Sequence, residues 1–152
     1  MIIGTDASIA CASGSRECWE AFASERAALA RYVKLCDSAD IHSELTFAQM
    51  MDGALNGEGA ARAALIETAH YLAIGISNLM KGLSPEAVIV GGQIARVWPI
   101  IAEELKSAVE ENSICRGLPS ASIIASTLGE NSRLMGALSL VLAAKFASMV
   151  SA

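Results

Sequence analysis

The sequence predicts an α/β fold in which helices pack on a small mixed sheet. Apolar residues recur at spacings of three and four along most of the chain, which is typical of amphipathic helices. Two short apolar runs, 87–90 and 121–125, are instead typical of strands, and a helical pattern that starts at Pro99 lies between them. A strand, a helix and a strand in this order predict a βαβ unit with parallel strands, almost always right-handed.

The first half of the chain predicts a loop followed by two helices. Residues 1–17 are rich in Gly, Ser and Ala and contain one apolar pair, which predicts a strand remnant and a loop. Residues 18–35 carry an apolar stripe and predict one helix, and 36–44 predict a loop. Thr46 is a candidate N-cap for a short helix that ends near Asn56 and Gly57.

The middle of the chain gives the clearest helix and the first strand. An alanine-rich pattern over 60–81 predicts a long helix, with Gly82 as its C-terminal cap. The β-branched run 87–90, between Pro85 and a glycine pair, predicts a fully buried, central strand.

The second half continues with two more helices. The helix that starts at Pro99 is expected to run toward Asn112. A last helix over 133–150 is expected to cover the sheet. Its most apolar segment, 134–144, is well short of the roughly 18 residues of a membrane span and predicts a buried helix.

Length and composition limit the class of protein. The chain has 152 residues, 53% of them hydrophobic, which predicts a single domain over 1–152 and excludes global disorder. Lys and Arg number 11 against 16 Asp and Glu, so we expect this chain to contact no nucleic acid. Four cysteines without a dense pattern, and no signal or membrane segment, predict a reducing cytoplasm and no membrane partner.

One motif carries most of the functional information. Residues 11–20 read CASGSRECWE, which resembles the C-x-C-G-x-x-G-C-x-E signature of the ROK (repressor, ORF, kinase) family. Cys11, Gly14, Cys18 and Glu20 match the signature in register. Further segments resemble other motifs of the family and follow one another in the same order as those motifs do. These segments are 24–27, 73–86, 88–92, 128–131 and 134–137.

The resemblance implies a ribonuclease H-like, actin/hexokinase-type fold, which has two lobes. This chain is similar to the C-terminal lobe, and we expect the N-terminal lobe to be absent from it. That other lobe carries a D-x-G-G-T-like phosphate turn and an Asn-Asp pair with the catalytic base. Residues 4–7 have similar letters but lack the necessary glycines. We therefore expect no catalytic residue and no catalysis by this chain alone.

The resemblance also implies a zinc knot of three cysteines and an upstream histidine, but this sequence departs from it. Ser13 replaces the middle cysteine, and both histidines, His42 and His70, lie downstream. Because two cysteines do not complete a tetrahedral site, we expect a degenerate knot at Cys11 and Cys18, no bound metal, and no other cofactor.

Two further sites follow from the resemblance. Glu20 matches the glutamate that accepts hydrogen bonds from sugar hydroxyls, although a solvated glutamate in a first helical turn is the alternative. Gly91, Gly92 and Gln93 follow a strand and match the turn that lies against the nucleotide in the family's kinases. A simple turn from strand to loop is the alternative.

These observations leave three functions open. The first is the sugar-sensing, dimerising lobe of a ROK-type transcriptional regulator, with a small sugar as ligand and a homodimer expected from the apolar surface of a partial lobe. The second is the C-terminal lobe of an ATP-dependent ROK kinase for a hexose or N-acetylated amino sugar. The third is a degenerate structural remnant.

Overall fold

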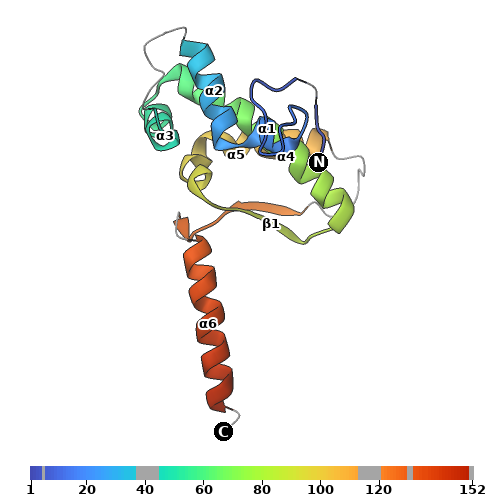
Figure 1. Cartoon of the computed structure of the whole chain (residues 1–152), viewed down its shortest axis with the longest axis vertical. Coiled ribbons are helices and arrows are strands. Elements are labelled where there is room, and N and C mark those ends of the chain that lie inside the picture. Colours follow the sequence, from blue (N-terminus) through green and yellow to red (C-terminus); the bar gives the residue numbers. More distant parts are fainter. Residues whose placement is uncertain (5, 37–44, 113–120, 130–131, 151–152) are drawn as a thin grey trace.

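The computed structural model describes residues 1–4, 6–36, 45–112, 121–129 and 132–150, and of the last helix it describes the side chains of 134–143. It is an α/β structure, as predicted (Figure 1). The elements in chain order are α1 (Trp19–Ala23), α2 (Glu25–Cys36), α3 (Phe47–Leu55), α4 (Gly59–Leu83), β1 (Ala87–Val90), the 3₁₀ helix η2 (Gln93–Val97), α5 (Trp98–Glu111), β2 (Ser122–Ala125) and α6 (Ser132–Val150).

Helix α4 is the centre of the helical body, because α1, α2, α3 and α5 all pack against it. Four of its alanines are fully buried, and such small side chains let neighbouring helices approach closely. The largest fully buried side chains come from the helices around it and from α4 itself, and they include Met50, Met51, Leu65, Ile101 and Leu105. One hydrophobic core therefore joins α2, α3, α4 and α5.

Two helix starts that the sequence predicts are confirmed. The Thr46 hydroxyl accepts a hydrogen bond from the Gln49 amide at 3.2 Å, and the Gln49 side chain bonds back to the Thr46 amide in a capping box. This helix ends at Leu55 with Asn56 as its cap. Pro99 lies in the first turn of α5, where a missing N–H costs nothing.

Two helix boundaries differ from the prediction. The expected single helix over 18–35 is interrupted at Ser24, whose backbone is extended with a ψ of 161°. The interruption is stabilised because the Ser24 hydroxyl accepts from the Ala27 amide at 3.3 Å and begins α2. The long helix continues past Gly82 to Leu83, and Ser84, with a φ of +45°, takes the capping position.

The two strands pair in parallel, with Val88 opposite Ile123. Within the described residues the sheet has only these strands, so it is parallel where a mixed sheet was expected. Ile123 packs into the core, whereas Ile89 and Ile124 on the other face are 65% and 46% exposed. The prediction of a fully buried central strand is wrong, because no second described layer covers that face.

Helix α6 extends away from the helical body (Figure 1). Its side chains from 134 to 143 are all exposed, with Leu140 at 75%. The expectations that 133–150 covers the sheet and that 134–144 is buried are therefore wrong for this chain. A helix that is apolar all round needs a partner, and the rest of the described chain does not supply one. Among the described residues, no helix has the length and apolar character that crossing a membrane requires.

Helix α1 is held on α4 by close packing of a tryptophan on a glycine. A Cβ atom added at Gly75 would lie 2.0 Å from Cε2 of the Trp19 ring. The Trp19 indole N–H also donates to the Tyr71 carbonyl at 2.8 Å. Only glycine at position 75 gives the indole room to make both contacts.

We predict that Gly75→Ala lowers the free energy of unfolding by about 2 kcal/mol, because the methyl group displaces the indole and breaks its hydrogen bond. Gly82→Ala in the same helix is the matched control. An added Cβ there meets nothing within 4 Å, so the helix gains up to about 1 kcal/mol from alanine's higher propensity. Urea unfolding measures both variants, and equal stability of the two would contradict the prediction.

Candidate functional site

The segment before α1 folds back on itself, and this brings the signature residues together. Three backbone hydrogen bonds join the two arms of the segment, from Ile3 N to Glu17 O at 3.0 Å, from Ala7 N to Arg16 O at 2.9 Å and from Cys11 N to Ser15 O at 2.8 Å. An isolated bridge pairs Ile2 with Cys18, which is the strand remnant that the sequence predicts. The arms place Cys11 beside the start of α1.

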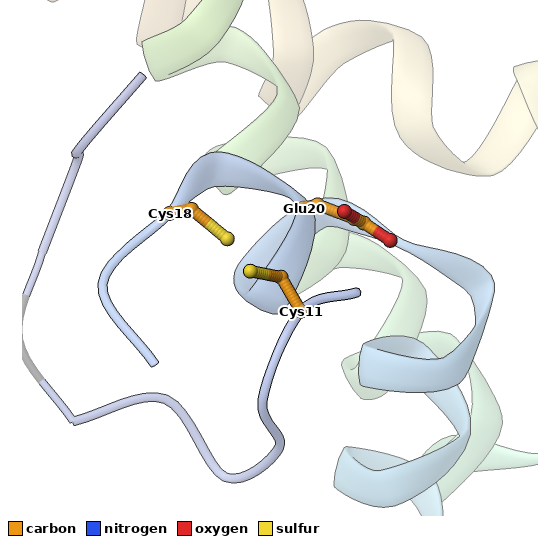
Figure 2. Close-up of side chains that lie close together, drawn as sticks. All are labelled: Cys11, Cys18 and Glu20. Atoms are coloured by element: carbon orange, nitrogen blue, oxygen red, sulfur yellow. The ribbon is translucent and has the colours of Figure 1, made fainter. Parts of the chain in front are cut away.

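Cys11, Cys18 and Glu20 form one cluster (Figure 2). Their sulfur and carboxylate oxygen atoms all lie within 4.8 Å of one another. Cys18 is the residue before α1, and Glu20 lies in the first turn of that helix. Figure 2 shows the two sulfur atoms pointing toward each other, with the Glu20 carboxylate beside them.

The two thiols of this cluster differ in acidity. The neighbouring Cys18 side chain and the Ser13 hydroxyl, 3.0 Å from the Cys11 sulfur, lower the pKa of Cys11 to about 7. The neighbouring Cys11 side chain raises the pKa of Cys18, whose thiol donates to the Ser15 carbonyl at 3.9 Å. Of the two thiols, Cys11 is therefore the one that loses its proton more readily.

The cluster does not fit a closed structural zinc site. Such a site takes four sulfur or nitrogen donors in a tetrahedron, and this cluster offers two thiols and a carboxylate. Ser13, at the position of the family's middle cysteine, contacts the Cys11 sulfur through its hydroxyl. Of the histidines, the described His70 pairs with Glu104 between α4 and α5, at 3.1 Å. That this chain holds no zinc stays a prediction.

The side chain of Arg31, on α2, bonds to both α1 and α4. Its side chain is buried and donates to Glu67 Oε1 at 3.0 Å, to Thr68 Oγ1 at 2.9 Å and to the Phe22 carbonyl. Its guanidinium also lies over the Tyr71 ring, 4.7 Å from the centroid. Burial lowers the pKa of Arg31, and the Glu67 carboxylate opposes that shift.

Arg31 was missed in the sequence analysis, although a signal was present. It lies on the same face of α2 as Ala27 and Ala28, and all three are buried. A single arginine on an otherwise apolar helix face predicts a buried, partnered charge.

A hollow surrounds part of the Arg31 side chain. It is bordered by the 6–8 loop and by α1, α2 and α4, and its lining includes Asp6, Phe22, Arg31, Glu67 and Tyr71. Ala21, which directly follows Glu20, also lines it. The hollow therefore combines charged and aromatic groups, and its lining residues do not include Cys11, Cys18 or Glu20.

The glycine turn after β1 is present where the sequence predicts it. Gly92 has a φ of +84°, a conformation that favours glycine, and Gln93 then begins η2. None of Gly91, Gly92 and Gln93 lines the hollow around Arg31. Their proximity to a nucleotide stays a prediction.

Comparison with known proteins agrees with this architecture and with the signature at its start. The model of the ROK family matches residues 1–144, so the chain belongs to the ROK family. It is similar to the xylose repressors of Caldicellulosiruptor bescii, with 28% identity over 87% of this chain, and of Bacillus subtilis, with 29% over 87%. It is also 30% identical, over 84% of its length, to a glucokinase of Streptomyces coelicolor.

Solved structures show the same fold. A ROK family glucokinase from Streptomyces griseus matches 91% of this chain with a TM-score of 0.76 and 22% identity. A ROK family transcriptional regulator, a homolog of the E. coli MLC protein, matches 82% with a TM-score of 0.67 and 19% identity. The chain spans 35% and 33% of the two xylose repressors and 49% of the S. griseus glucokinase chain.

We predict that Arg31→Met lowers the free energy of unfolding by about 2 to 3 kcal/mol, because it leaves the Phe22 carbonyl without its partner and separates α1 from α2 and α4. Arg26→Met is the control, since Arg26 is an exposed arginine in the same helix and its loss should cost less than about 0.5 kcal/mol. Chemical denaturation of the two variants, side by side, measures the difference. If Arg31→Met changed the free energy of unfolding as little as Arg26→Met does, the contacts of Arg31 would contribute little to stability.

Proposed function

We propose that this chain is the sugar-sensing and dimerising lobe of a ROK-type transcriptional regulator and is not catalytic by itself. The observation that carries the proposal is its similarity to xylose repressors along 87% of its length. The sequence also lacks the phosphate turn and the Asn-Asp pair that phosphoryl transfer needs. Residues 1–152 then form a single domain, the C-terminal lobe, in a cytoplasmic protein whose DNA contacts belong to other residues.

Glu20 is the proposed sugar contact. Its carboxylate is exposed, so both oxygens can accept hydrogen bonds from sugar hydroxyls. The preceding residue, Trp19, fixes α1 on α4 and so fixes the position of this carboxylate. The polar hollow that the next residue, Ala21, lines offers further hydrogen-bonding groups for a small sugar. Xylose is the first sugar to test, because the similar repressors are named xylose repressors.

A homodimer is the second part of the proposal. The exposed face of the sheet and the exposed apolar side chains of α6 are surfaces that soluble chains normally cover. A two-fold dimer is the simplest arrangement that would cover them.

The kinase alternative keeps one specific observation in its favour. The glycine turn follows the carboxyl end of β1, where open α/β sheets bind ligands, and the chain is similar to ROK glucokinases. In that case Gly91, Gly92 and Gln93 lie near ATP in the whole enzyme. Transfer of phosphate from ATP to glucose by the isolated chain would contradict the regulator proposal.

We expect xylose, or another sugar from a panel of pentoses, hexoses and N-acetylated amino sugars, to raise the thermal midpoint of the wild-type chain. Binding to the folded state alone adds about 2.7 kcal/mol at a hundredfold excess over Kd. Glu20→Gln should abolish the shift, because the amide removes the charge that strengthens the hydrogen bonds. Differential scanning calorimetry measures the shift.

The matched control for this experiment is Glu17→Gln. It removes the same charge from an exposed glutamate three residues earlier and should leave the sugar response unchanged. A shift that survives in Glu20→Gln would exclude Glu20 as the contact. The absence of a shift with every sugar would favour the structural remnant.

For the dimer, we expect sedimentation velocity of the wild-type chain to give a two-chain mass. Leu140→Lys places a charge in the middle of the exposed apolar surface of α6 and should shift the equilibrium to monomer. A wild-type chain that sediments as a monomer at all concentrations would contradict this part of the proposal.

A further inference from the structure

The two signature thiols face each other without the third cysteine that the family signature contains. Their sulfur atoms point toward each other and lie within 4.8 Å. Both cysteines are reduced in this structure. Closure requires the two facing sulfurs to approach from this separation to the S–S length of a disulfide, about 2.05 Å.

The backbone between the thiols forms a short, bonded loop. Gly14, with a φ of +83°, makes the turn, and its amide donates to the Cys11 carbonyl at 2.9 Å. The Cys11 amide donates to the Ser15 carbonyl at 2.8 Å. Cys18 is then anchored by the adjoining hydrogen bond from the Trp19 amide to the Met1 carbonyl, at 2.8 Å. These hydrogen bonds of the loop therefore keep the two cysteines close together.

We propose that Cys11 and Cys18 are a redox-active dithiol that closes reversibly into an intramolecular disulfide. This inference is independent of sugar binding by Glu20. It follows from the replacement of the middle cysteine by Ser13, which leaves two thiols where a closed zinc site would need four donors.

The two thiols have different roles in closure. Cys11 is buried, whereas Cys18 is partly exposed, so a small-molecule disulfide such as oxidised glutathione reacts first at Cys18. The Cys18 sulfur bonds to one glutathione sulfur and the other leaves as a thiol. The Cys11 thiolate then attacks the Cys18 sulfur and expels the second glutathione. The two cysteines lose two electrons and two protons, and one oxidised glutathione becomes two thiols.

The surroundings of Cys11 favour the second step. The Ser13 hydroxyl lies 3.0 Å from the Cys11 sulfur and can still donate a hydrogen bond to the Cys11 thiolate, the nucleophile of thiol exchange, after Cys18 has bonded to glutathione. Ser13 thereby gains a role in place of the missing cysteine. Closure would join the residue before α1 to the preceding loop and would change the groups beside the Glu20 carboxylate.

The test is a titration of the full wild-type chain with mixtures of reduced and oxidised glutathione, followed by alkylation and mass spectrometry. We expect a loss of two free thiols and a mass decrease of two hydrogens per chain, with one peptide pair linked through Cys11 and Cys18. Dithiothreitol should restore both thiols. Circular dichroism before and after shows that the fold is kept.

Three variants complete the test. Cys11→Ser should stop at a stable glutathione adduct on Cys18, Ser13→Ala should slow closure, and the control Cys36→Ala should close like the wild type. Glutathione adducts on the wild-type chain without an 11–18 link would overturn the proposal. One equivalent of tightly bound zinc that protects both thiols from glutathione would overturn it as well.

Discussion

The burial of a small-residue surface on α4 is the constraint on which the rest of the structure depends. Ala61, Ala64, Ala69 and Ala73 are fully buried, and Gly75 continues the surface toward the next turn. Because these positions carry almost no side chain, helices α1, α2, α3 and α5 can all pack on one central helix. The signature cluster lies on the short helix α1, so its geometry follows from how closely α1 can approach α4.

Features set by local interactions could be read from the sequence. The capping box at Thr46 and the proline in the first turn of α5 involve residues within one helical turn, and both were predicted correctly. The two strands were also located correctly, since a β-branched run between turn residues is a local signal. The family resemblance singled out Cys11 and Cys18 as a degenerate zinc knot and Glu20 as a sugar contact, and the structure brings these three residues together.

Features set by distant contacts could not be read in the same way. The position of α1 relative to α2 involves Arg31, whose guanidinium bonds to the end of α1 and to α4, and the unbroken apolar stripe over 18–35 gave no sign of these contacts. Burial of β1 and α6 was overestimated for a related reason. Apolar residues show that a surface requires cover, but they do not say whether the cover comes from this chain or from another body.

The close fit of Trp19 on Gly75 also has a spectroscopic consequence. The indole packs on Gly75 and bonds to the backbone of α4, so its fluorescence depends on whether α1 stays packed on that helix. Trp98 is the other tryptophan of the chain, and it begins α5. The substitution Trp98→Phe would therefore leave a single native fluorophore that reports on the contact between α1 and α4, without any attached label.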